Sequence, residues 1–147
     1  MKKELASSTD INASPEEVWS VLTDFAKFPE WNPFMLWVKG DLRKGAKLEV
    51  RIQPSEARGS TFKPTVLVVN PPKELRWLGH LWINGLFDGE HILTIESIGA
   101  NLARFEQKEI FNGLFVRLLS KSLDRETLRG FNEMNKALKE QVEMHHK

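Results

Sequence analysis

The spacing of hydrophobic and polar positions changes along the chain and predicts different elements in turn. Residues 4–11 alternate weakly between apolar and polar side chains, which predicts a first strand. Residues 34–111 form alternating or β-branched runs divided by turn signals, which predicts a series of strands. Residues 114–145 carry apolar side chains three and four positions apart with charges between them, which predicts one long helix. No linker or repeat interrupts this order, so we expect a single α+β domain over residues 1–147.

Helix signals lie between the first strand and the strand series. Ser14 is a typical N-cap residue, Pro15 suits the first helical position, and Glu17 completes a capping box. Pro29 and Pro33 then stop helix propagation. We therefore expect a helical hairpin of two short helices after the first strand.

The strand series has six expected members. They lie near residues 34–39, 46–53, 62–70, 74–82, 86–97 and 102–112. Their connections are too short for helical crossovers, so neighbouring strands should be antiparallel. Together with the first strand they form an expected seven-stranded antiparallel sheet. The C-terminal helix would be roughly 40 Å long, enough to cross that sheet.

Five local segments are informative when they are taken in chain order. They are residues 11–19 (INASPEEVW), 28–34 (FPEWNPF), 75–77 (LRW), 89–91 (GEH) and 105–114 (FEQKEIFNGL). Together they resemble the SRPBCC superfamily, and within it the polyketide cyclase/dehydrase and lipid-transport group of START-like, Bet v 1-like proteins. The resemblance implies the helix-grip fold, in which a curved seven-stranded antiparallel sheet surrounds a long C-terminal helix and leaves an internal cavity. The functions it implies are those of lipid and sterol carriers, plant hormone receptors, aromatase/cyclases and quinone-binding proteins. The catalytic domains of ring-hydroxylating oxygenases also belong to the superfamily, but the sequence has no pattern of Rieske cluster ligands or of a two-histidine, one-carboxylate iron site.

Composition narrows the possible functions. The chain has 21 basic and 20 acidic side chains and a net charge of +1, so no strong field favours nucleic acid. It has no cysteine, which excludes disulfides and thiolate metal ligands. Its apolar runs are too short for a membrane span, and no apolar stretch follows Met1, so we expect a cytoplasmic protein. We expect no cofactor or metal, and either a monomer or a homodimer.

The predicted strands place apolar side chains on one face and charged side chains on the other, because residues two positions apart share a face. The apolar faces, the loop before residue 34 and the apolar start of the long helix should enclose the cavity. A small hydrophobic ligand is thus expected among Phe34, Val50, Trp77, Leu81, Phe87, His91, Leu93, Phe105, Gln107, Glu109, Phe115, Leu118 and Leu119. Five tryptophans, nine phenylalanines and no tyrosine suit either such a cavity or an aromatic core.

Three of these inward residues are polar, and each has two interpretations. His91, Gln107 and Glu109 would orient a ligand within apolar walls. They would equally well bond one another or the backbone for a structural purpose. In a third use, His91 and Glu109 would act as general acid and base, helped by Gln107.

The hydrophobic pattern does not determine how the tryptophans outside the inward faces are oriented. Trp31 and Phe34 would either gate the cavity or pack the hairpin against the sheet. The strand parity around Trp37 and Trp82 leaves their orientation open.

Three functions remain after these arguments. The first is a binding or carrier protein for a lipid-like or aromatic molecule, which needs no catalytic group. The second is an enzyme of the cyclase/dehydratase kind that acts on a polyketide-like substrate. The third is an interaction module controlled by a ligand. Metal binding is disfavoured, because neither His80 nor His91 has a histidine four residues further on.

Overall fold

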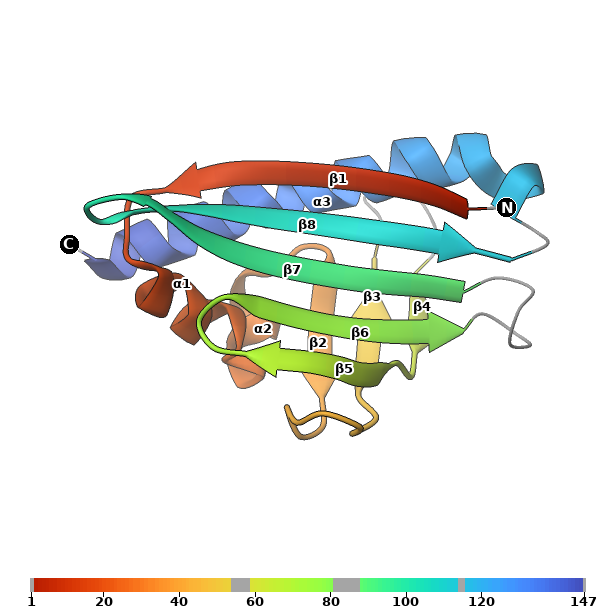
Figure 1. Cartoon of the computed structure of the whole chain (residues 1–147), viewed down its shortest axis with the longest axis horizontal. Coiled ribbons are helices and arrows are strands. Elements are labelled where there is room, and N and C mark those ends of the chain that lie inside the picture. The colour runs from red at the N-terminus through yellow and green to blue at the C-terminus, as the bar shows by residue number, and fades with distance from the viewer. Residues whose placement is uncertain (1, 54–58, 81–87, 114–115, 147) are drawn as a thin grey trace.

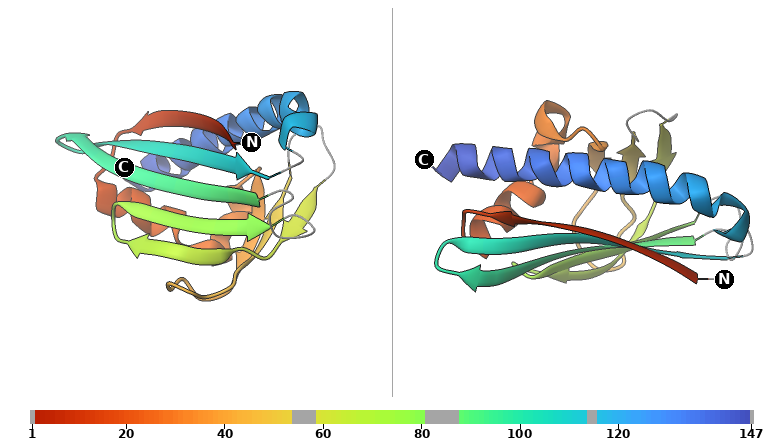
Figure 2. Two further views of the ribbon diagram at one scale, coloured as in Figure 1. Left: turned by 45° about the vertical axis from the view of Figure 1, so that its right-hand side comes forward. Right: turned by 90° about the horizontal axis from the view of Figure 1, so that it is seen from above.

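The structure is a computed structural model that describes residues 2–53, 59–80, 88–113 and 116–146, without the side chains of residues 117–124 and 146. A large antiparallel sheet forms one layer (Figure 1). The long C-terminal helix, the helical hairpin and a small sheet all lie against one face of this sheet. The long helix runs along the face of the large sheet, as the view from above in Figure 2 shows. This is the helix-grip α+β architecture that the sequence predicts.

The described residues form eight strands and a small number of helices. In chain order they are β1 Lys2–Ile11, α1 Pro15–Leu22, η1 Phe25–Lys27, α2 Phe28–Trp31, β2 Met35–Lys39, β3 Glu49–Ile52, β4 Ser60–Phe62, β5 Thr65–Asn70, β6 Glu74–His80, β7 Asp88–Gly99, β8 Leu102–Asn112 and α3 Val116–His146. The large sheet has the order β1-β8-β7-β6-β5 and the small one β2-β3-β4, with antiparallel pairing throughout.

The expected count of seven strands is corrected to eight within the described residues. The expected strand at residues 62–70 is two strands, because Pro64 lacks an amide hydrogen and cannot continue a ladder on both sides. Its carbonyl instead accepts a hydrogen bond from the Leu48 amide at 2.9 Å. A single bridge between Lys47 and Thr65 joins the two sheets at this point.

The start of α1 follows the predicted capping box. Ser14 Oγ accepts a hydrogen bond from the Glu17 amide at 3.2 Å, and Glu17 Oε1 accepts one from the Ser14 amide at 3.3 Å. Pro15 occupies the first turn, where a missing amide hydrogen costs nothing. This cap fixes the direction in which the hairpin leaves the end of β1.

The second half of α3 packs into the concave face through an apolar stripe. Phe131, Met134 and Leu138 are fully buried, and Val142 is nearly so. They repeat at helical spacing, so one face of α3 supplies the core while the opposite face stays polar.

The C-terminal end of α3 is also fastened to the turn after β1. Glu143 Oε2 accepts hydrogen bonds from the Asn12 amide at 2.9 Å and from Lys139 Nζ at 2.7 Å. The hydrogen bond from Lys139, and next the one from the Asn12 backbone, lower the pKa of Glu143 below its usual value. Within the described residues, no helix is both long enough and apolar enough to cross a bilayer.

A glycine lets the helical hairpin approach α3 closely. The ring of Phe34 lies directly on Gly130, where an added Cβ would overlap the ring. The same ring meets Phe131 edge-on, with 5.7 Å between the ring centroids. Because Gly130 has no side chain, the Phe34 ring packs directly against the backbone of α3.

We expect Gly130→Ala to lower the free energy of unfolding by about 1–3 kcal/mol, because the overlap with Phe34 outweighs about 1 kcal/mol of helix propensity gained from alanine. Urea unfolding followed by circular dichroism measures the difference. In a Phe34→Ala background the same substitution should be neutral or stabilising. A rise in stability on Gly130→Ala in the otherwise unchanged chain would contradict the close packing described above.

Candidate functional site

The concave face of the large sheet brings the polar candidates together. The register places His91 of β7 opposite Trp77 of β6 on one side and opposite Glu109 of β8 on the other. Gln107 lies two residues further along β8, opposite Leu93. These side chains share one face, as the alternation in the sequence predicts, and α3 covers that face.

The imidazole of His91 is held between two acceptor oxygens. Its Nδ1 lies 2.9 Å from Glu109 Oε1, and its Nε2 lies 3.0 Å from Gln107 Oε1. The His91 side chain is only 4% exposed, whereas that of Glu109 keeps 13% exposure. The pair is thus nearly enclosed, with its open part at the carboxylate.

The orientation of the Gln107 amide determines where one proton must lie. Gln107 Nε2 donates to Asn135 Oδ1 at 2.7 Å and points to the Phe131 carbonyl at 3.4 Å, so its Oε1 faces His91 as an acceptor. His91 Nε2 must therefore carry a hydrogen. On the other side of the ring a hydrogen bond joins His91 Nδ1 to Glu109 Oε1, so one hydrogen lies between these two atoms.

The polar network continues from the sheet into α3 and β1. Asn135 Nδ2 donates to Ser7 Oγ at 3.1 Å, and Ser7 Oγ in turn donates to Asn132 Oδ1 at the surface. Gln107 is fully buried and Asn135 is 3% exposed, so each amide depends on these partners. These hydrogen bonds hold His91 in position on the side of the imidazole that faces Gln107.

Two aromatic rings pack against the imidazole of His91. The Trp77 ring lies 5.6 Å from His91, at an interplanar angle of 33°, and Phe131 meets it edge-on at 5.3 Å. Because Phe131 also contacts Phe34, a row of four rings crosses from the sheet through α3 to the hairpin. We name Phe34, Phe131, His91 and Trp77 the aromatic row.

This arrangement gives a general acid–base pair held in place within apolar surroundings, with a carboxylate that water can reach. It suits binding, by orienting a ligand, and it suits proton transfer to a bound molecule. No group of three or more histidine, aspartate or glutamate side chains in the described part of the chain is arranged to hold a metal ion.

The sequence matches the model of one protein family over almost its whole length. The family is described as polyketide cyclase/dehydrase and lipid transport, and the match covers residues 2–143. The chain belongs to this family. Comparison with curated protein sequences gives no match.

Solved structures with the same fold include several enzymes. A norcoclaurine synthase mutant from Thalictrum flavum, in complex with a transition-state analogue, gives a TM-score of 0.76 at 15% identity and covers 100% of this chain and 98% of its own. The Zhui aromatase/cyclase from Streptomyces sp. R1128 gives 0.74 at 11% identity, covering 100% and 97%. A START superfamily protein from Mycobacterium smegmatis gives 0.70 at 18% identity, covering 96% and 97%. At these identities the likeness shows the fold alone.

The other candidate residues of this polyketide cyclase/dehydrase family member are placed as follows. Phe34, Val50, Trp77, Leu93 and Phe105 are all buried at 5% exposure or less. Phe34 belongs to the aromatic row and lies inside the core. Leu81, Phe87 and Phe115 lie outside the described residues, as do the side chains of Leu118 and Leu119.

The tryptophans whose orientation the pattern left open are partly resolved. Trp31 packs edge-on against Phe28, with 5.2 Å between the ring centroids, which favours the packing interpretation over a gate. Trp37 lies beneath the ammonium of Lys39 at 4.6 Å, away from the concave face. Trp82 lies outside the described residues.

Sequence reasoning missed the part of the network that α3 and β1 supply. Asn135 is a polar residue inside the apolar stripe that Phe131, Met134 and Leu138 form, and Ser7 shares the inward parity of Leu5. A polar residue at a predicted core position is the signal that would have found Asn135, because such a group needs a buried partner.

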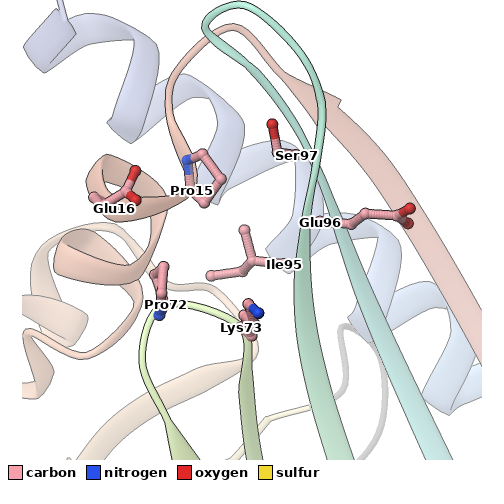
Figure 3. Close-up of a pocket in the computed structure, with 7 residues that line it drawn as sticks. All are labelled: Pro15, Glu16, Pro72, Lys73, Ile95, Glu96 and Ser97. Atoms are coloured by element: carbon pink, nitrogen blue, oxygen red, sulfur yellow. The ribbon is translucent and has the colours of Figure 1, made fainter.

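A separate hollow of about 350 Å³ lies at the other end of the sheet (Figure 3). Its lining comes from the start of α1, the turn between β5 and β6, and the end of β7: Pro15, Glu16, Pro72, Lys73, Ile95, Glu96 and Ser97. None of the candidate ligand residues lines it. Its volume is at the low end of the range for small-molecule sites, and its few charges lie at the rim, so we do not assign the candidate site to it.

We expect Gln107→Leu to lower the free energy of unfolding by about 2–4 kcal/mol, because it leaves His91 Nε2 and Asn135 Oδ1 without partners. Urea unfolding measures the loss. The double variant Gln107→Leu/Asn135→Leu should lose less than the sum of the single variants, since the two amides act as one unit. Gln141→Leu on the outer part of α3 is the control and should change stability by less than about 0.5 kcal/mol. Simple additivity would contradict the network.

Proposed function

We propose that this protein binds a small hydrophobic molecule in a cavity between the concave face of the large sheet and the first half of α3. The observation that carries the proposal is the enclosure of His91, Gln107 and Glu109 by apolar and aromatic side chains on that face. Apolar walls with a few fixed polar groups are the usual composition of a ligand site.

Stability alone does not account for this arrangement. An ionisable pair buried in an apolar core is often no more stabilising than apolar residues of similar volume, because both groups lose their hydration. Moreover, Glu109 keeps 13% exposure although it lies between Leu5 of β1 and His91 of β7 on the covered face. A carboxylate that solvent reaches on the inner face is what a ligand would meet there.

The solved structures add support at the level of the fold. One structure of norcoclaurine synthase from Thalictrum flavum holds dopamine and hydroxybenzaldehyde, so this architecture accepts aromatic molecules in at least one case. The family description also names lipid transport. Both classes therefore belong in a ligand screen.

We expect at least one class among fatty acids, flavonoids, quinones and polyketide-like aromatics to bind saturably with one molecule per chain and a dissociation constant on the order of micromolar. Isothermal titration calorimetry and native mass spectrometry measure it. Trp77→Leu should weaken binding by about tenfold or more, and Trp37→Leu, a matched change away from the concave face, should not. Absence of binding across the panel would overturn the proposal, as would equal effects of the two substitutions.

A second function is favoured by one distance. His91 Nδ1 and Glu109 Oε1 lie 2.9 Å apart, which is the geometry of a pair that passes a proton. We propose, as the alternative, a cyclase/dehydratase-type enzyme in which this pair is the general acid and base.

The enzyme alternative predicts that a bound polyketide-like compound is converted to product, as liquid chromatography with mass detection would show. His91→Gln and Glu109→Gln should then slow turnover by about 10²- to 10⁴-fold while the dissociation constant changes far less. Full turnover in both variants would exclude the acid–base role. Binding without turnover in the unaltered protein would leave the carrier function standing alone.

A further inference from the structure

Two glycines face each other on the concave side, next to the aromatic row. Gly79 of β6 pairs with Gly89 of β7, two residues along each strand from the Trp77–His91 pair and therefore on the same face. Among the described residues, the atoms closest to a Cβ built on Gly79 are Pro64 Cβ at 3.8 Å and the Gly89 carbonyl oxygen at 3.9 Å. The described residues therefore leave room above Gly79 for an added carbon at ordinary van der Waals distance from its neighbours.

The carboxylate of Glu109 reaches over one of these glycines. A Cβ built on Gly89 would lie 2.9 Å from Glu109 Oε2 and 3.8 Å from Phe111 Cδ1. Glycine at position 89 thus makes space for the carboxylate. We name the space above Gly79 and Gly89, between Trp77 and Glu109, the glycine hollow.

The two oxygens of Glu109 have different surroundings. Oε1 is engaged by His91 Nδ1 at 2.9 Å, whereas Oε2 lies over the glycine hollow and has no hydrogen-bond partner among the described residues. The side chain keeps 13% exposure, so solvent reaches part of the carboxylate group. Oε2 is the polar atom that a ligand in this space would meet.

The proton arrangement determines what kind of ligand group fits. Since Gln107 fixes a hydrogen on His91 Nε2, the one remaining shared proton lies between His91 Nδ1 and Glu109 Oε1. Whether nitrogen or oxygen holds it, Glu109 Oε2 carries no hydrogen and is an acceptor. A hydroxyl satisfies it. A ligand carboxylate or an ether oxygen brings a second acceptor and is rejected.

We propose that the glycine hollow is a specificity subsite for the hydroxyl-bearing edge of a flat ring, with the ring over the backbone of Gly79 beside Trp77 and the hydroxyl donating to Glu109 Oε2. This rests on the proposed function and narrows its ligand class to phenols, against fatty acid anions. Close approach of the ring to the backbone is the reason for glycine at position 79, and the Glu109 carboxylate is the reason for glycine at position 89.

The test compares three probes of one shape: 2-naphthol, 2-methoxynaphthalene and 2-naphthoate. Titrations followed by two-dimensional ¹H–¹⁵N spectra give their dissociation constants. In the unaltered protein 2-naphthol should bind about tenfold more tightly than the ether, and the naphthoate more weakly still. In Glu109→Ala the ratio of naphthol to ether should approach one, because the acceptor is gone.

A second variant tests the hollow independently of the carboxylate. Gly79→Val places two methyl groups in the free space and should weaken 2-naphthol by about tenfold or more while the fold, checked by circular dichroism, is retained. Gly99→Val is the matched control at the far end of β7, where an added Cβ would meet Leu102 Cβ at an ordinary 3.6 Å. It should leave the affinity unchanged.

The outcomes separate the two proposals. Equal affinity for naphthol and ether in the unaltered protein, or a ratio that persists in Glu109→Ala, would overturn the subsite and leave the cavity function intact. Binding of other compounds in the wider panel, with none of the three naphthalenes bound, would do the same. Failure of the naphthalenes and of the whole panel would overturn both.

Discussion

A buried imidazole with hydrogen-bonding demands on both sides is the constraint around which this interior is arranged. His91 lies in an apolar layer, where an unmatched polar atom would cost free energy comparable to a lost hydrogen bond. Satisfying it requires Glu109 and Gln107 on the adjacent strand, which fixes the register of β7 against β8. Satisfying Gln107 in turn requires Asn135, which fixes the rotation and height of α3 over the sheet. Secondary structure elements distant in sequence are thus positioned by one set of bonds.

The two sides of the His91 imidazole have different surroundings. The Gln107–Asn135–Ser7 side of the imidazole faces protein and is fully engaged, so it serves to hold the ring. The Glu109 side of the imidazole is less enclosed, because the carboxylate side chain keeps 13% exposure. This division fits both functions of the family, because a carrier needs an oriented acceptor and an enzyme needs a proton held at a defined atom.

Much of the fold could be predicted from the sequence because its signals are local. The capping box at Ser14, the two-residue alternation of β7 and β8 and the helical spacing in α3 each depend on neighbours in the chain. The division at Pro64 was missed because it depends on what the flanking residues pair with, which is a property of the assembled sheets. The role of Gly130 could likewise not be predicted, because it depends on the contact with Phe34, which is far away in the sequence.

The site was predicted in part for the same reason. Strand parity placed His91, Gln107 and Glu109 on one face, but parity says nothing about a helix more than twenty residues further along the chain. The hydrogen bonds of Asn135 and Ser7 therefore could not be predicted, because they depend on how α3 and β1 pack on the sheet. The reason for glycine at position 89 likewise depends on an assembled contact, because the Glu109 carboxylate lies where a side chain would stand.

The aromatic row has a consequence for the shape of any guest. Its four rings run from the large sheet through α3 to the residue before β2, and Ile95, Phe105 and Leu138 are buried in the same core. A long acyl chain laid along the helix would have to displace that row. A compact ring system would require less rearrangement of the core than a long chain.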